Sequence, residues 1–134
     1  MAKFFKYKTL DMLREDVEQL GVNVRLEDEL RACLEPLDVG GRTVGNRFAI
    51  HPMEGCDGEL DGKPGELTVR RWERFGAGGA KLIWGEATAV AEEARANTRQ
   101  LLINEDNLAS LADMLEVTRK AHRDSIGDDS DLLI

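Results

Sequence analysis

The stretch Asn46-Arg47-Phe48-Ala49-Ile50-His51-Pro52-Met53 is followed directly by the polar run Glu54-Gly55-Cys56-Asp57-Gly58. Residues 48–53 form a short, mostly apolar segment bounded by turn residues, which is typical of a buried strand in a parallel sheet. Pro52 has no backbone N–H to donate, so it ends the strand. A strand that ends at a polar loop can hold a ligand at its carboxyl end. This stretch therefore predicts both a strand and a binding site.

Turn residues lie on both sides of this strand. Residues 34–44 place two apolar segments around Gly40-Gly41, which predicts a β-hairpin. After the strand, residues 54–66 contain three turn dipeptides in succession: Asp57-Gly58, Asp61-Gly62 and Pro64-Gly65. They predict a long loop on the face where α/β barrels place their active sites.

A helix is predicted after this loop. Thr68 is a suitable N-cap residue, and the apolar residues that follow fall on one side: Val69, Trp72 and Phe75. Three glycines are expected to end the helix: Gly76, Gly78 and Gly79. Residues 80–90 then predict a second strand, because Leu82-Ile83-Trp84 is an unbroken apolar run and the polar Glu86 and Thr88 mark its emergence at the surface.

A third helix is predicted after the polar, irregular residues 91–100. It starts near Asn104 or Asp106, both of which can cap a helix. Its expected buried residues are Leu108, Leu111, Ala112, Leu115 and Thr118, and its apolar stripe is widened by Met114, Val117 and Ala121. Residues 131–134 read as the beginning of another strand. Alternating strands and helices of this kind are typical of a parallel α/β fold.

The amino-terminal part of the chain has a different pattern. Apolar residues recur at helical spacing from Thr9, and Gly21 stands where a left-handed cap would end the helix. Residues 26–34 repeat the pattern, with Cys33 expected to be a small buried side chain. We expect residues 1–33 to form an acidic helical extension. It either covers the domain of residues 34–134 or contacts a partner or a second copy of the chain.

Composition restricts the possible partners. The chain has 134 residues and a net charge of −8, with the acidic residues spread along it. Neither a phosphate backbone nor anionic lipid attracts such a surface, so neither nucleic acid nor a membrane is an expected partner. No run of eighteen apolar residues occurs, and two cysteines fit no metal-ligand spacing and suit a reducing compartment. We expect a cytoplasmic protein without a bound metal.

Two apparent ligand motifs fail on their spacing. The run Gly76-Ala77-Gly78-Gly79 precedes a strand, whereas a dinucleotide fingerprint must open a helix. The acidic residues from Asp57 to Gly62 imitate half of a calcium loop, but Thr68 stands where the bidentate Glu is required.

The remaining candidates have two interpretations each. His51 is more often a packed residue than a catalyst, and His122 is expected to be a favourable cation near a helix end. Cys56 could contact a ligand or be an ordinary loop residue. Glu54 and Glu86 could form a carboxylate pair if their strands are adjacent, although a solvated Glu86 at the rim is the expected arrangement.

Taken together, the hairpin, NRFAIHPM, the Asp-Gly loop, RWERFGAGGAKLIWGEATAV and the helix after INEDN resemble the start of an Old Yellow Enzyme family barrel. The resemblance runs from about Leu34 to Ile134. It implies an α/β fold, a (β/α)8 TIM barrel of which this chain contains the first two to three β/α units after a short helical extension. A complete barrel has ~250 residues, so the sequence is expected to stop inside the fold.

The resemblance also implies a function. Family members use FMN to pass hydride from NADH or NADPH to an activated alkene or related acceptor. At matching positions, Pro52, Met53, Glu54 and Ala87 would contact the flavin. Cys56 and His51, which are next to this site in the sequence, are candidates for positions near the substrate. Relatives often have Cys, Thr or Gly at position 54 and a small residue at position 51, so electronics and substrate choice are expected to differ here. The catalytic residues are expected beyond Ile134.

Two other interpretations remain open. The chain could be a non-catalytic fragment or split half-barrel that associates with a partner chain, or a complete small α/β domain. Alone, it would leave the edge of its last strand unpaired and the barrel interior exposed to water. Exposing ~500 Å² of apolar surface forgoes ~12 kcal/mol of burial, so we expect the isolated chain to be inactive as a reductase.

Overall fold

The computed structural model describes residues 6–29 and 31–134. The chain divides into two units, Met1–Arg31 and Ala32–Ile134. In the first unit, helix α1 (Leu10–Leu20) begins and ends as the sequence predicts. The hydroxyl of Thr9 accepts a hydrogen bond from the Met12 amide at 3.3 Å, and Gly21 adopts a left-handed φ of 61°. Local capping chemistry therefore determines both ends of this helix.

The second helix is much shorter than the predicted 26–34 segment. Helix α2 spans only Arg31–Leu34, and it buries none of its side chains. A single helical turn that buries nothing is marginal, because each residue loses conformational entropy without burial to offset it. Cys33 is half-buried, so the prediction of a buried cysteine was wrong. Leu30 and residues 1–5 of the predicted extension lie outside the described residues.

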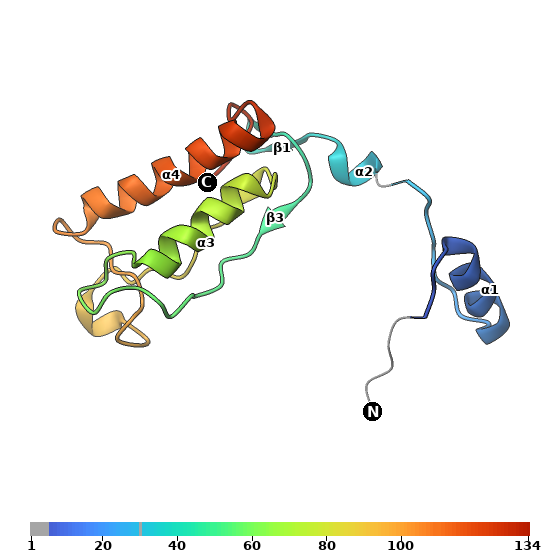
Figure 1. The fold of residues 1–134 in the computed structure, drawn as a ribbon, viewed down its shortest axis with the longest axis horizontal. Coiled ribbons are helices and arrows are strands. Elements are labelled where there is room, and N and C mark those ends of the chain that lie inside the picture. Colours follow the sequence, from blue (N-terminus) through green and yellow to red (C-terminus); the bar gives the residue numbers. More distant parts are fainter. Residues whose placement is uncertain (1–5, 30) are drawn as a thin grey trace. The chain divides into compact units, whose positions relative to one another are not determined.

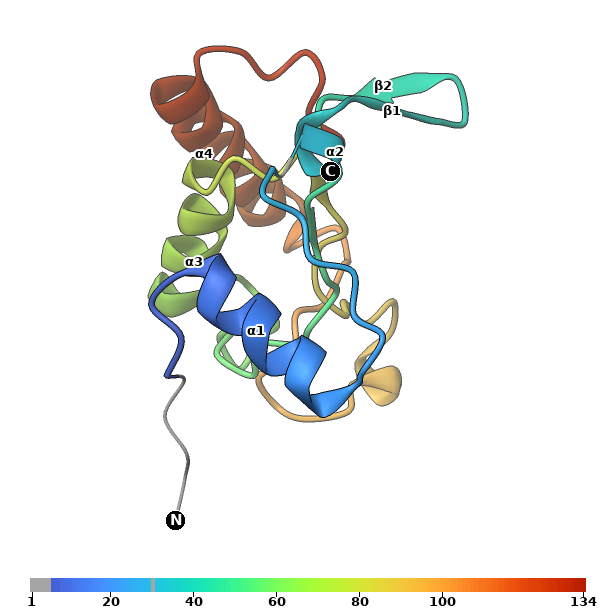
Figure 2. The same ribbon diagram turned by 90° about the vertical axis from the view of Figure 1, so that its right-hand side faces the viewer.

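The predicted hairpin is confirmed. Strands β1 (Leu37–Val39) and β2 (Arg42–Val44) pair antiparallel. Gly40 and Gly41 have φ values of 61° and 81°, as a two-residue type I′ turn requires. Figure 2 shows the hairpin as a two-stranded ribbon that projects from the rest of its unit.

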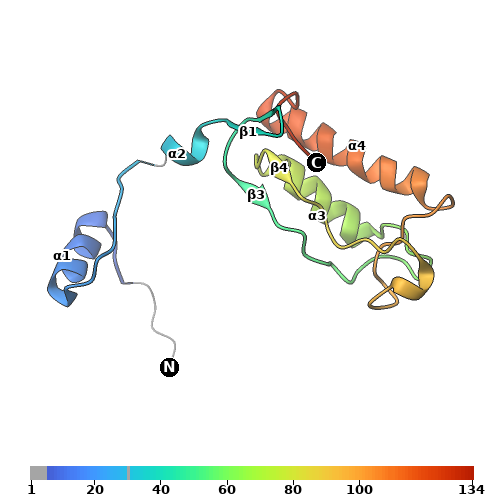
Figure 3. The ribbon, with the colours of Figure 1, turned by 180° about the vertical axis from the view of Figure 1, so that it is seen from behind.

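Strands β3 (Ala49–Ile50) and β4 (Leu82–Ile83) pair in parallel, as predicted. They lie side by side, with the helices on one side of them (Figure 3). Leu133 adds a parallel bridge to Leu82, which places the last residues of the chain next to β4. The two strands are shorter than the predicted segments 48–53 and 80–90. Pro52 cannot donate to a ladder and Gly85 has a φ of 88°, so both strands end early.

Helices α3 (Glu66–Ala77) and α4 (Leu108–Ile126) lie side by side and run in the same direction (Figure 1). Gly76 was expected to end α3, but it lies inside the helix. A Cβ at this position would lie 2.1 Å from the carbonyl oxygen of Thr118, so the glycine allows the two helices to approach closely. The helix ends instead at Gly78, whose amide donates to the carbonyl of Arg74.

The predicted N-caps of α3 and α4 were both wrong. Helix α3 begins after Gly65, and Thr68 is a buried residue of its first turn. Helix α4 begins after Asn107, one residue beyond the later candidate. The side chain of Asn104 accepts a hydrogen bond from the Asn107 amide at 2.9 Å, so Asn104 supports the turn before the helix.

The core lies between the short strands and the two helices. Its buried residues are Trp72, Ile83, Leu101, Met114 and Leu132. On α4, the predicted core residues Leu108 and Leu115 are 58% and 37% exposed, whereas Met114, Thr118 and His122 are buried. The predicted burial of Thr118 is confirmed, and the buried stripe also contains His122, a polar residue that a hydrophobic pattern overlooks. No helix among the described residues is long and apolar enough to span a bilayer.

His122 corrects another prediction. It was expected to be a cation near the end of α4, but its side chain is fully buried. Its Nδ1 lies 2.8 Å from the carbonyl oxygen of Gly76, which can only accept, so Nδ1 carries the donated proton. His122 thus joins α4 to α3 at the point where Gly76 allows their close approach.

Candidate functional site

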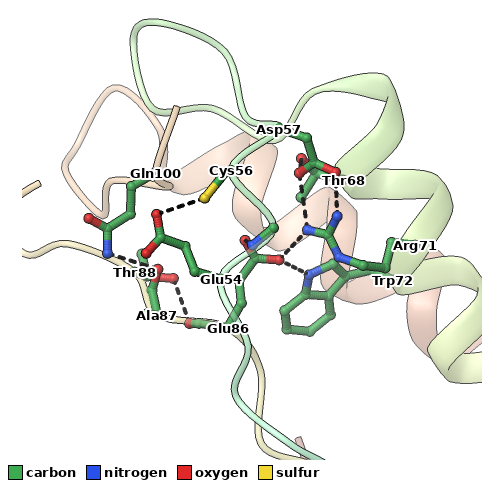
Figure 4. A network of polar contacts seen from close by, with 11 residues as sticks. Glu54, Cys56, Asp57, Thr68, Arg71, Trp72, Glu86, Ala87, Thr88 and Gln100 are labelled. Atoms are coloured by element: carbon green, nitrogen blue, oxygen red, sulfur yellow. Dashed lines mark hydrogen bonds and ion pairs between the residues drawn. The ribbon is translucent and has the colours of Figure 1, made fainter. Parts of the chain in front are cut away.

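The carboxyl ends of β3 and β4 meet at one edge of the unit, where a network of polar side chains joins them (Figure 4). Residues 51–58 follow β3 and residues 84–90 follow β4. Helix α3 contributes three side chains from behind: Thr68, Arg71 and Trp72. This is the edge at which parallel α/β folds bind ligands, because the loops that connect their strands to helices converge there.

Glu86 lies at the centre of the network. Its side chain is only 3% exposed and accepts hydrogen bonds from Arg71 Nη2 (2.7 Å) and Trp72 Nε1 (2.8 Å). The Gly55 amide also donates to it, at 3.4 Å. The expectation of a solvated Glu86 was therefore wrong. Helix α3 supplies a cation and an indole N–H that allow a carboxylate to be buried at this position.

Asp57 is the second carboxylate that Arg71 holds. It accepts hydrogen bonds from both terminal nitrogens of Arg71 and, at 2.8 Å, from the hydroxyl of Thr68. Burial alone would raise the pKa of Asp57, but the hydrogen bonds from Arg71 and Thr68 outweigh it and lower the pKa overall. The same hydrogen bond to Asp57 stabilises the charged form of Arg71 and so raises the pKa of its guanidinium. This pairing explains why Thr68 is buried inside α3 and does not cap it.

Glu54 and Cys56 form a separate small cluster with Asn97. The side-chain amide of Asn97 donates to Glu54, and the Cys56 thiol donates to the same carboxylate at 3.4 Å. The hydrogen bond to Glu54, followed by desolvation, raises the pKa of the Cys56 thiol. A thiol with a raised pKa remains protonated at neutral pH, so Cys56 is not an activated nucleophile.

The residues predicted to contact a flavin lie at the surface of the strand ends. Met53 is 77% exposed, Pro52 and Ala87 are exposed, and Glu54 is half-buried. The Ala87 carbonyl accepts a hydrogen bond from the side chain of Gln100 at 3.1 Å. His51 is also exposed. The small side chain of Ala87 beside the exposed Pro52 and Met53 suits a flat ring that stacks on the strand ends.

Three residues of this site were missed from sequence: Arg71, Asn97 and Gln100. Asn97 and Gln100 belong to the stretch that appeared polar and irregular, where no periodicity assigns a role. Arg71 lies three residues after Thr68, so the two share a helix face. That spacing was the available signal, but the aspartate that both residues contact lies in the preceding loop.

An apolar pocket of about 310 Å³ opens beside the network. It lies between the end of β4 and helix α4, and its lining residues are Trp72, Trp84, Gly85, Glu86, Thr88, Ile103, Leu111, Met114, Leu115 and Ile134. Within residues 6–29 and 31–134, no three His, Cys, Asp or Glu side chains converge as a metal site would require.

The fold defines a parallel β/α unit whose strand ends and polar network meet at one edge. Solved structures extend this assignment. The chain is similar to the old yellow enzyme from Trypanosoma cruzi, with a TM-score of 0.58 and 23% identity over 67% of this chain and 24% of that one. It is also similar to a crystal structure of TcOYE with pHBA, with a TM-score of 0.59 and 22% identity over 69% of this chain and 25% of that one.

These similarities establish the fold. About two thirds of the chain folds like part of an Old Yellow Enzyme, so the predicted resemblance is confirmed at the level of structure. The chain spans about a quarter of the length of the structures that it matches. No family model matches the sequence, and no curated protein matches it.

Proposed function

We propose that this chain provides flavin-binding strand ends to an FMN-dependent oxidoreductase of the Old Yellow Enzyme type. The observation that supports this most strongly is the arrangement of Met53 and Ala87 at adjacent, exposed ends of parallel strands. The ordered network behind them holds the backbone of both ends. Similarity of fold to the Trypanosoma cruzi enzyme supports the same assignment.

The residues present fit the ring of FMN. Pro52, Met53 and Glu54 would lie along one edge of the ring after β3, and Ala87 would lie against it after β4. Because the side chain of Ala87 is a methyl group, it leaves room for a planar group to approach the backbone. When bound, FMN supplies hydride transfer from NADH or NADPH to an activated alkene or related acceptor.

The chain's own residues would control the surroundings of the ring. The carboxylate of Glu54 would place negative charge near the cofactor and disfavour a reduced, anionic ring. The protonated Cys56 thiol and the exposed His51 would stand on the substrate side. The residues at this edge would bind and orient the cofactor.

The test is reduction of a bound flavin followed by its reoxidation. The protein purified from the cells that make it should be bleached by NADH or NADPH under anaerobic conditions, and an activated alkene should restore its colour. A flavin-free protein that assembles with a partner chain or with itself would instead favour a structural role in association.

A further inference from the structure

A single side chain joins the two strand ends of the candidate site. Arg71, on α3, forms ion pairs with Asp57 in the loop after β3 and with Glu86 after β4. The side chains are 26%, 19% and 3% exposed, respectively. Figure 4 shows the guanidinium between the two carboxylates. A planar guanidinium can hold two carboxylates in fixed directions, which an ammonium cannot do equally well.

Gly55 is packed directly against this guanidinium. A Cβ on Gly55 would lie 2.0 Å from Nη2 of Arg71, so the absence of a side chain is necessary for the observed arrangement. The Gly55 amide also donates to Glu86. Gly55 lies between Glu54 and Cys56, and its position therefore determines where those two side chains leave the backbone.

The other strand end is held in the same way. Glu86 is fixed by Arg71 and Trp72 and directly precedes Ala87. The carbonyl of Ala87 is held in turn by Gln100. Movement of the Arg71 guanidinium would loosen both strand ends at once, because two carboxylates would lose their shared cation and keep only the hydrogen bonds from Thr68, Trp72 and the Gly55 amide.

We infer that Arg71 is a positioning residue, which holds the Gly55 and Ala87 backbones in the geometry that the cofactor requires. The role of the cofactor in this inference rests on the proposed function. Arg71 itself acts from behind the strand ends, through Asp57 and Glu86. Groups that orient a binding layer from behind typically change affinity by ~10-fold or more when they are removed.

The experiment compares Arg71→Gln, Arg71→Lys and Arg70→Gln in the protein purified from its own cells. Arg70 is the exposed neighbour on the same helix and provides the matched control. Hydrogen exchange of backbone amides is measured first, without added FMN. Arg71→Gln should accelerate exchange ~10-fold at residues 54–58 and 86–88 and leave residues 114–122 of α4 unchanged. Arg70→Gln should change neither region.

FMN affinity is measured second, by titration of the flavin-free protein. Arg71→Gln should weaken FMN affinity ~10-fold. Arg71→Lys should weaken it less, because lysine keeps the positive charge but lacks the planar guanidinium that can hydrogen-bond to two carboxylates. Unchanged exchange would overturn the inference, as would faster exchange with unchanged affinity. If the unmodified protein bound no FMN, the proposed function would fail, and with it the cofactor role of Arg71. The hydrogen-exchange data would still report whether Arg71 holds the strand ends. If Arg71→Gln failed to fold, Arg71→Lys would give the same comparison on a smaller scale.

Discussion

The two ends of strand β4 both contain a buried charge, but they differ in what surrounds it. At the amino end, Lys81 is 9% exposed at its side chain and pairs with Asp131, while its ammonium also donates to the Asp128 carbonyl at 3.1 Å. Gly45 is packed so closely that a Cβ would lie 1.8 Å from the Asp131 carboxylate. At this end, Lys81 is buried and Asp131 is partly exposed at 33%.

At the carboxyl end, the buried Glu86 lies directly before the exposed Ala87. The charge is held from behind by α3, and the backbone in front of it faces solvent. The two ends of β4 therefore use their ion pairs differently. At the amino end, the Lys81–Asp131 ion pair joins β4 to the residues just before Leu132. At the carboxyl end, the Arg71–Glu86 ion pair lies behind an exposed surface, which is the surface that we propose binds the cofactor.

The amino end should dominate stability. Changing Lys81 to Ala leaves Asp131, which is 33% exposed, without its cation and should reduce the free energy of unfolding by about 2 kcal/mol, because the carboxylate loses a charged hydrogen bond. FMN affinity should be unaffected once the protein is folded. Chemical denaturation measures the loss. Lys120→Ala, which removes an exposed pair with Asp124, is the control and should have no measurable effect. If Lys81→Ala and Lys120→Ala reduced the free energy of unfolding equally, the Lys81–Asp131 pair would have no special role in stability.

The open end should dominate binding. A Trp in place of Ala87 would stand on the proposed cofactor surface and should weaken FMN binding by ~30-fold, equivalent to ~2 kcal/mol. Because Ala87 is exposed, thermal unfolding should be almost unchanged. Val90→Trp, at an exposed position on the same segment, is the matched control. A fluorescence titration that found both variants equally impaired would place the cofactor elsewhere.

The smallest expected effect is a pH dependence at Asp57. Its pKa is lower in the folded chain than the ~3.9 of an unfolded one, so its contribution to stability is fully present above that value and is lost as the pH falls through the folded pKa. Asp57→Asn should therefore cost about 1 kcal/mol at pH 7 and progressively less in acid. Denaturation at a series of pH values checks this. A constant difference across the range would show that Asp57 contributes no charge-dependent stability.

The sequence predicted those elements whose ends and turns depend on residues close together in the chain. Thr9 and Gly21 cap α1, and Gly40-Gly41 form the hairpin turn, because the required hydrogen bonds and φ angles involve neighbouring residues. The parallel pairing of β3 and β4 was also predictable, since a helix connects them. By contrast, the role of Thr68 depends on Asp57, which lies eleven residues earlier in sequence.

The same distinction separates the predicted and unpredicted parts of the site. Residues such as Met53 and Ala87 could be named because they follow apolar strands within a family-like motif. Arg71 could not, because its role depends on two carboxylates in different loops. The burial of His122 was equally hidden, since it requires Gly76 on another helix to bring α3 and α4 together.

Native mass spectrometry of the protein purified from the cells that make it tests the central claim most directly, because one spectrum reports chain mass, assembly and bound flavin. We expect one FMN for each copy of these strand ends. A flavin-free protein, whether a single chain or an assembly, would contradict it.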